Sequence, residues 1–187
     1  MFCMPEYTDS HEDLIEHFAK RDQGLLLSRD WVRVEFTPGD IPADLGTWQL
    51  RVDEWSCHDW VDLDVLRTRL VALVSRHLIS APHRLLLGDW YILIDGAKVD
   101  SVKNARIVFM YDNSRVDSLC DNSRVTDMYN NSRVTDMCNN SRVDSMRDSS
   151  QVDSMRDNSR VDSMYHNSRV TDMYNNSRVT NPTRLAQ

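Results

Sequence analysis

Residues 122–130 read NSRVTDMYN, and residues 131–139 repeat them as NSRVTDMCN. The same nine-residue unit extends from Asn104 to Arg184, with Val or Ile at its fourth position in every copy and Met or Leu at its seventh in most. A unit this short buries its apolar residues against its neighbours, so the repeat predicts a stacked array. The copies begin at Asn104, Asn113, Asn122, Asn131, Asn140, Ser149, Asn158, Asn167 and Asn176.

The positions within the unit predict which side chains face inward. Ser at the second position and Val at the fourth lie two residues apart, so they share one face of a strand. Met at the seventh position follows Val by three residues, which predicts a bend between them. Asn at the ninth and first positions suits tight corners, because Asn tolerates positive φ. Arg at the third position is therefore expected to point outward.

Nine residues are too few for a closed coil with an interior, so we expect two units per coil and two opposed parallel sheets. Residues 18 apart should then stack at ~4.8 Å, the spacing between neighbouring strands. Cys120 and Cys138 become stacked neighbours, an arrangement that needs neither a disulfide nor a metal. The eighth positions form two columns: Tyr111, Tyr129, Arg147 and Tyr165 in one, and Cys120, Cys138, Arg156 and Tyr174 in the other.

This repeat resembles two groups of known solenoids. Its period is similar to that of the calcium-binding nonapeptide β-rolls, and its recurrent Asn and Val residues resemble the grass ice-binding proteins. The resemblance covers about half of the chain and implies a parallel β-solenoid. The Gly-Gly-x-Gly-x-Asp calcium turns are absent, and Arg stands where ice binders carry a row of small hydroxyl residues. We therefore expect neither calcium nor ice binding.

The outward arginines allow two interpretations. Stacked like charges repel, and each unit from 113 to 175 carries an Asp at its fifth or sixth position, so alternating Arg–Asp ladders are expected. The alternative is a face that binds a polyanion or a glycan through the Arg and Tyr columns. That face would consist of Arg106, Arg124, Arg142, Arg160, Arg178, Tyr129, Arg147 and Tyr165.

The front of the chain predicts a small α+β domain over residues 1–87, followed by the solenoid over 88–184 and a tail over 185–187. Apolar residues recur at helical spacing over 59–78, which indicates the main helix. Residues 96–103 already form a degenerate eight-residue copy of the unit, and no Pro/Gly/Ser-rich linker precedes it. The front domain is therefore expected to cap the first coil.

Charge separates the two halves. Residues 1–103 carry 11 Lys or Arg against 18 Asp or Glu, whereas residues 104–187 carry 11 Arg against 11 Asp. An acidic front argues against direct nucleic-acid binding. No segment approaches the ~20 apolar residues of a membrane span, and the first residues lack the pattern of a secretory signal. We expect a cytoplasmic protein with reduced thiols and no membrane contact.

The last unit predicts an exposed edge. Pro182 replaces the seventh-position Met, and Pro interrupts strand pairing. An uncovered parallel edge invites a second chain, so we expect a homodimer through the last one or two coils. The residues at this dimer edge are Val170, Met173, Tyr174, Val179, Pro182 and Leu185.

No catalytic motif or cofactor-binding loop is found, so we expect no cofactor and favour a non-enzymatic interaction or inhibitor module. A compact acidic surface can engage a basic groove on another protein, such as a nucleic-acid-handling complex. Phage anti-restriction and anti-CRISPR inhibitors use that logic, which makes an anti-defence role a hypothesis. A hydrolase or metal enzyme in the front domain remains open. The acidic candidates are Asp40, Asp44, Asp53, Glu54, Asp59, Asp62 and Asp64.

Overall fold

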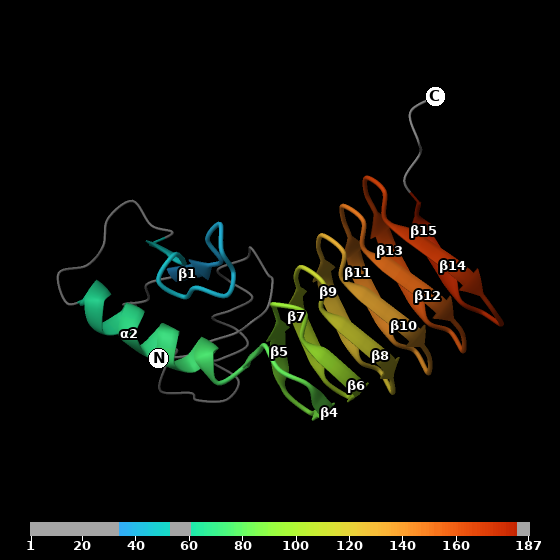
Figure 1. Ribbon diagram of the computed structural model, residues 1–187, viewed down its shortest axis with the longest axis horizontal. Coiled ribbons are helices and arrows are strands. Elements are labelled where there is room, and N and C mark those ends of the chain that lie inside the picture. The colour runs from blue at the N-terminus through green and yellow to red at the C-terminus, as the bar shows by residue number, and fades with distance from the viewer. Residues whose placement is uncertain (1–33, 53–60, 183–187) are drawn as a thin grey trace, which may run out of the picture. The chain divides into compact units, whose positions relative to one another are not determined.

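The computed structural model describes residues 34–52 and 61–182 (Figure 1). The chain divides between Leu73 and Val74 into two compact units, a front unit and a solenoid unit. Among the described residues, no helix is long and apolar enough to cross a membrane.

The front unit contains a two-stranded antiparallel sheet of β1 (Val34–Thr37) and β2 (Gln49–Val52). Trp48 is buried beside this sheet, and its ring centroid lies 5.2 Å from that of Phe36. The Trp48 indole N–H donates to the Pro42 carbonyl at 3.0 Å, which satisfies its polar edge.

One helix, α2 (Leu63–Ser75), lies in the front unit up to Leu73, and its last two residues belong to the solenoid unit. Asp62 caps it, because its Oδ1 accepts from the backbone N–H groups of Asp64 at 3.1 Å and Val65 at 3.0 Å. The helix is shorter than the expected range of 59–78, since this cap fixes its start after Asp62. The Arg67 guanidinium donates to the Gly46 carbonyl at 2.9 Å, so the helix is tied to the loop before β2.

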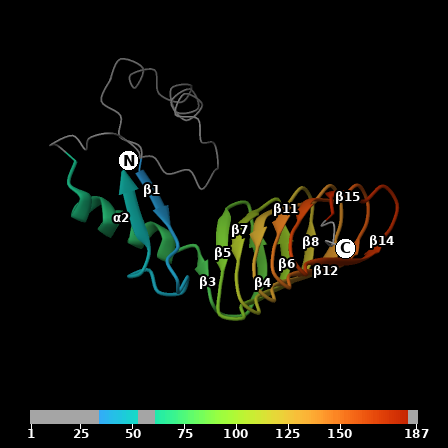
Figure 2. The same ribbon diagram turned by 90° about the horizontal axis from the view of Figure 1, so that it is seen from above.

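The repeat region is a parallel β-solenoid of about six turns with two parallel sheets, as the nonapeptide predicts (Figures 1 and 2). The seven-stranded sheet contains β3 (Leu78–Ile79), β5 (Trp90–Leu93), β7 (Arg106–Met110), β9 (Arg124–Met128), β11 (Arg142–Met146), β13 (Arg160–Met164) and β15 (Arg178–Asn181). The six-stranded sheet contains β4 (His83–Leu87), β6 (Lys98–Lys103), β8 (Arg115–Cys120), β10 (Arg133–Met137), β12 (Gln151–Met155) and β14 (Arg169–Met173).

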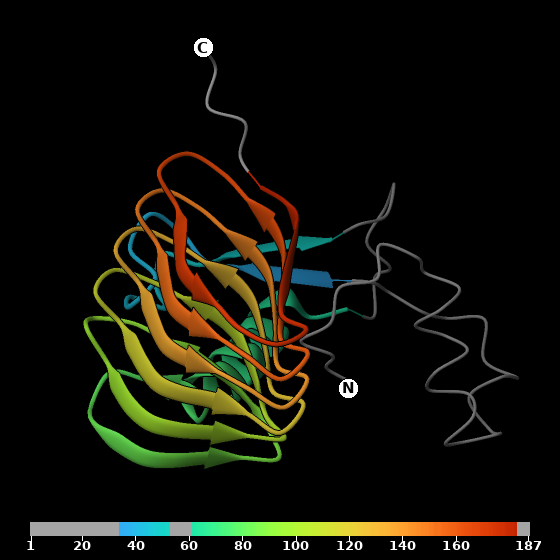
Figure 3. The same cartoon turned by 90° about the vertical axis from the view of Figure 1, so that its right-hand side faces the viewer.

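Consecutive units alternate between the two sheets, so each coil holds two units, as expected. The register pairs Val134 of β10 with Val152 of β12 and Val143 of β11 with Val161 of β13, residues that are 18 apart. Viewed from the end of the array, the flattened coils lie one behind another (Figure 3). Along the regular repeats the fifth position has no register partner, which agrees with the expected bend between Val and Met.

The interior follows the predicted positions. The fourth-position residues from Ile107 to Val161 and the seventh-position residues from Met110 to Met155 have no exposed surface. The second-position serines from Ser114 to Ser159 are equally buried beside the corners. The Ser123 hydroxyl donates to the Val102 carbonyl at 3.0 Å, which links one coil to the previous coil.

Residues at the corners of the coils have positive φ. Every ninth-position residue from Asp112 to Asn175 has φ between 50° and 58°. The first-position residue has a positive φ only in alternate units, at Asn104, Asn122, Asn140 and Asn158. Two successive residues with positive φ match a type I′ turn, so the two sides of the solenoid turn differently.

The sheets begin earlier than the expected boundary at residue 88. The two residues of β3 pair with β5, and β4 pairs with β6 in register from His83 to Leu87. These strands lack the repeat motif but continue the apolar face, since Ile79 and Leu86 are buried in the solenoid core. The expected capping of the first coil by the front domain stays a prediction.

Candidate functional site

The acidic candidates of the front unit are exposed where the structure describes them. Asp40, Asp44, Asp62 and Asp64 all lie at the surface, and Asp53, Glu54 and Asp59 lie outside the described residues. Two of the four also hold local structure: Asp62 caps α2, and the Asp44 carboxylate accepts from the Gly46 N–H at 2.9 Å. Asp40 and Asp64 are therefore the positions at which a charge can be changed with the least structural cost.

The arginine column of the seven-stranded sheet is neutralised by aspartates. Arg124 contacts Asp144 at 2.5 Å, and an Arg142 nitrogen lies 2.7 Å from the other oxygen of Asp144. Asp162 takes contacts from both Arg142 and Arg160. At the start of the column, Arg106 donates to the Thr126 hydroxyl at 2.7 Å, and Arg178 is exposed on β15.

The six-stranded sheet carries a shorter version of the same network. Arg115 pairs with Asp117 at 2.6 Å, and Arg133 pairs with Asp153 of the next coil. Gln151 replaces the third-position Arg, and it accepts from Arg169 at 2.8 Å. The expected Arg–Asp ladder is thus confirmed in the middle of the array, and it weakens the case for a positive stripe that binds a polyanion.

The eighth-position column of the seven-stranded sheet stacks as expected. The rings of Tyr111 and Tyr129 lie 5.0 Å apart and are nearly parallel. The Arg147 guanidinium lies between Tyr129, at 5.9 Å, and Tyr165, at 5.0 Å. Because the rings face each other along the column, they turn their edges outward, which is a poor platform for stacking a sugar. Phe109, which the sequence did not single out, lies 5.6 Å from Tyr111.

Burial shifts the pKa of several groups at this column. Burial is the main reason that the pKa of the Tyr111 phenol is raised, and Tyr129 and Asp127 add to the effect. Burial likewise raises the pKa of the Asp127 carboxyl, although Ser145 and Arg147 oppose it. At Asp162, burial also acts upward, but the hydrogen bond from Arg160 and the charge of Arg142 lower the pKa overall.

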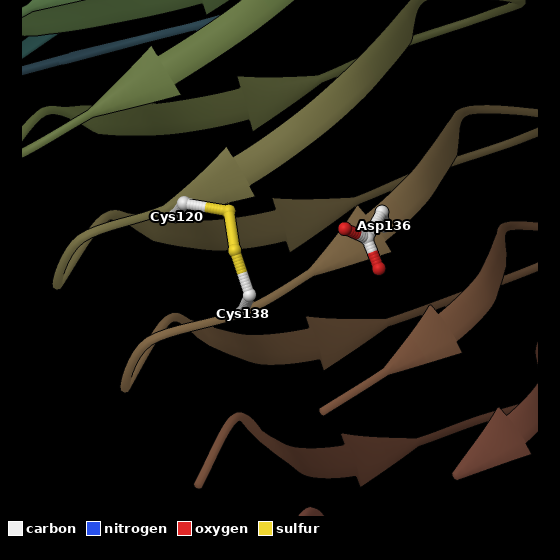
Figure 4. A group of neighbouring side chains, drawn as sticks. All are labelled: Cys120, Asp136 and Cys138. Atoms are coloured by element: carbon white, nitrogen blue, oxygen red, sulfur yellow. A yellow bond between two sulfur atoms is a disulfide. The ribbon is translucent and has the colours of Figure 1, made fainter. Parts of the chain in front are cut away.

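The other eighth-position column contains a disulfide. The structure confirms that Cys120 and Cys138 are stacked neighbours and joins them covalently, with their Cα atoms 4.7 Å apart (Figure 4). The expectation of two unbonded, reduced thiols is therefore wrong for this pair. In-register eighth positions on adjacent coils lie within the Cα separation that a disulfide needs, so the repeat itself brings the two sulfurs together.

Asp136 joins the cysteines in one cluster, which the sequence did not predict. The two sulfurs and a carboxylate oxygen of Asp136 lie within 4.8 Å of one another, and this is the group suited to hold a metal among the described residues. The cluster lies where β10 ends, and Asp136 is two residues before Cys138 (Figure 4). A comparison of the sixth and eighth positions of one unit with the eighth position 18 residues earlier would have shown that these three side chains lie together.

Two cations flank the cysteines in the same column. The register pairs Lys103 of β6 with Cys120, and Arg156 occupies the eighth position of the coil after Cys138. Arg156 also donates to Asp136 at 2.8 Å. The sequence did not predict Lys103 as a member of this column, because its unit lacks a ninth residue. Lys103 therefore lies 17 rather than 18 residues before Cys120.

The corners carry a second network that the sequence analysis missed. Ninth positions alternate between Asp and an uncharged or His residue from one coil to the next: Asp112, Asn130, Asp148 and His166 on one side, and Asp121, Asn139, Asp157 and Asn175 on the other. The Asn139 amide donates to Asp121 at 2.9 Å, and the Asn175 amide donates to Asp157 at 2.8 Å. Alternation keeps carboxylates apart and gives each one a donor.

Burial falls off at the last coil. Val161 of β13 has no exposed surface, whereas Val170 of β14 and Val179 of β15 are partly exposed. Met173 is 45% exposed and Tyr174 is 56% exposed. The predicted edge residues are thus uncovered in the described part of the chain, where Pro182 is exposed as well; Leu185 lies outside it.

Comparison with protein-family models, curated proteins and solved structures found no match to this chain.

Proposed function

We propose that this chain is a non-enzymatic interaction protein, in which the solenoid pairs two copies and the acidic front unit binds a protein partner. The observation that carries the proposal is the loss of burial between β13 and β15. An array that excludes water from Val161 but leaves Val170, Met173 and Val179 partly open has an apolar end. Such an edge favours association with an identical edge.

A second copy is the occupant that fits this end. The last strands, β14 and β15, each pair with one neighbour among the described residues, so each keeps one side with unpaired backbone groups. A two-fold axis would set the same strands of two copies against each other and close the assembly. Met173 and Tyr174 supply large apolar side chains at that interface.

The mass of the full chain in solution tests the pairing. We expect a dimer by light scattering at micromolar concentration, and a monomer for Met173→Lys, because a lysine at the apolar end disfavours association. Thr171→Lys adds the same charge to an exposed position of the same strand and is the matched control, which should remain a dimer. A monomeric mass for the unchanged chain would remove the dimer from the proposal.

The front unit is the part that we assign to a partner, through charge complementarity with a basic groove. Its support is the exposure of Asp40 and Asp64 in a half of the chain that carries a net charge of 11 minus 18, or −7. A nucleic-acid-handling complex, as engaged by anti-restriction and anti-CRISPR inhibitors, is the partner class that this chemistry suits. The Arg and Tyr columns are assigned to the scaffold because their charges and ring faces are used within the array.

Affinity capture with the tagged full chain tests this assignment. We expect a specific protein partner whose capture is lost in Asp40→Lys/Asp64→Lys and kept in Asp117→Lys, an exposed solenoid position. Asp44 and Asp62 are left unchanged because they hold local structure. Equal capture by all three chains would contradict the acidic surface, and dimer formation would remain a separate result.

A further inference from the structure

The cluster of Cys120, Asp136 and Cys138 has a composition that the solenoid does not require. The other eighth positions from 111 to 174 are Tyr or Arg, and their stacking needs no sulfur. Here two small side chains stand between Lys103 and Arg156 in the column, and the two cysteines are only 6% and 5% exposed. Ser118 adds a hydroxyl 3.3 Å from the Cys120 sulfur.

These donors match the preferences of a thiophilic divalent cation. Two thiolates and a carboxylate are ligands that Zn²⁺ takes in four-coordinate sites, with sulfur at ~2.3 Å. Two sulfurs on one tetrahedral ion stand about 3.8 Å apart. The side chains of Cys120 and Cys138 leave parallel, adjacent strands with Cα atoms 4.7 Å apart, so rotation about their side-chain bonds can provide that separation.

The surrounding charges favour deprotonation of the two thiols. Positive charge beside a thiol favours the thiolate, the form that binds a metal, and Lys103 and Arg156 stand on either side of the pair. Arg156 also holds Asp136, but it has a second carboxylate within reach, since Asp157 lies 3.7 Å away. Arg156 can therefore release Asp136 to a cation without losing its own ion pair.

We propose that, when the disulfide is reduced, Cys120, Cys138 and Asp136 form a binding site for Zn²⁺ or a similar thiophilic divalent cation. The fourth position is open to water. The disulfide and the metal exclude each other, because the cation binds thiolate sulfurs and the oxidised pair has no thiolate. The site is thus available only in one redox state of the protein.

The redox step balances with a thiol reductant. Two small-molecule thiols transfer two electrons and two protons to the Cys120–Cys138 bond and become a disulfide themselves, which leaves two protein thiols. Binding of the cation then releases the two thiol protons to solvent as both sulfurs become thiolate ligands. Removal of the cation and loss of two electrons to an oxidant restore the original bond.

Co²⁺ provides a spectroscopic probe, because thiolate ligands give it an intense ultraviolet charge-transfer absorption. The full chain should carry Cys3→Ser and Cys57→Ser, so that the two solenoid cysteines are the remaining ones. After reduction and removal of the reductant, we expect one Co²⁺ per chain, which Zn²⁺ displaces. The oxidised chain should show no charge-transfer band.

Variants then identify the donors. Cys138→Ser should abolish the absorption, and Asp136→Asn should weaken binding by more than about tenfold, since loss of even an outer partner of a metal ligand typically costs that much. Asp172→Asn is the matched control, since Asp172 occupies the same sixth position two coils later without cysteines beside it, and its affinity should be unchanged. Circular dichroism establishes that each variant keeps its β structure.

Three outcomes would overturn the proposal. They are the absence of a charge-transfer band in the reduced chain, equal binding by the oxidised chain, and unchanged affinity in Asp136→Asn.

Discussion

Among the ninth positions from 112 to 175, His166 is the one residue that is neither Asp nor Asn, and it has a φ of 55°. A non-glycine residue at positive φ carries strain, which Asn bears more easily than His. We expect His166→Asn to raise the free energy of unfolding by about 0.5–1 kcal/mol. The new amide can also donate to Asp148, as Asn130 donates to Asp112 at 3.2 Å.

Ser149 supplies the control for that measurement. It is the one first-position residue that is not Asn, and it lies on the side of the solenoid where the first position has no positive φ. Ser149→Asn should therefore leave the urea midpoint unchanged. An equal gain at both positions would show that Asn stabilises the corner for a reason other than its backbone conformation.

Asp127 gives the array a pH dependence of known sign. Its folded-state pKa is raised, chiefly by burial, so the charged carboxylate is less favourable in the fold than in the unfolded chain. That cost is fully present above the raised pKa and disappears as the pH falls below the ordinary value. We expect Asp127→Asn to be more stable than the unchanged chain at neutral pH, with the difference shrinking on acidification.

Asp162 should behave in the opposite way, since its pKa is lowered in the fold. Its contribution is present above the ordinary Asp pKa and is lost as the pH falls through the lowered value. Asp162→Asn is thus expected to destabilise the chain at neutral pH. Urea unfolding at several pH values measures both effects, and parallel profiles for the two variants would contradict these signs.

At the level of strands and coils, most of the correct predictions came from the spacing of residues within the repeat. The steps of two and three residues between Ser, Val and Met placed Ser123, Val125 and Met128 inside, where all three are buried. The two corner conformations could not be predicted, because units with the same residues alternate between them. Asn occupies the first position on both sides of the solenoid, although only one side requires a positive φ there. Ser149 is the single first-position residue other than Asn, and it lies on the side without a positive φ.

Prediction was weakest where repetition was weak or missing. Strands β3 and β4 carry no copy of the unit, so their place in the two sheets depends on Ile79 and Leu86 finding the core. The acidic candidates were chosen from charge alone, and charge does not distinguish a helix cap such as Asp62 from a free surface group. Prediction of the disulfide required both the 18-residue register and knowledge of whether the thiols are oxidised, which the sequence does not provide.

Deletions of different length test the coil period. Removing residues 140–157 takes out one complete coil, so Cys120 and Cys138 should remain neighbours and keep their bond. Removing residues 122–130 takes out half a coil and places the two cysteines on opposite sheets, about 10 Å apart, which is beyond the reach of a disulfide. Alkylation under denaturing conditions, followed by mass spectrometry, counts the free thiols.

Both deletion chains should retain β-sheet circular dichroism, because the inward residues are the same in both sheets. An intact disulfide in the half-coil deletion would contradict two units per coil.

Across the whole molecule, the disulfide joins two neighbouring coils of the solenoid unit. It closes a loop of 18 residues, which removes conformational entropy from the unfolded chain and so raises the free energy of the unfolded state by about 3 kcal/mol. We expect reduction to lower the stability of the solenoid unit by about that amount, measured as a lower urea midpoint. Cys120→Ser/Cys138→Ser should have the same midpoint with and without reductant.

The alternating corner columns also restrict how the array can change in length. Asp and its amide or imidazole partner exchange places at every coil, so the pattern returns to its starting point only after two coils, or 36 residues. Gain or loss of a single coil sets two Asp residues, or two residues without a carboxylate, side by side at the new junction, on both sides of the solenoid at once. Recombination that adds or removes four units at a time, or two coils, therefore preserves the alternation. The array is expected to change in length most easily by two coils rather than by one.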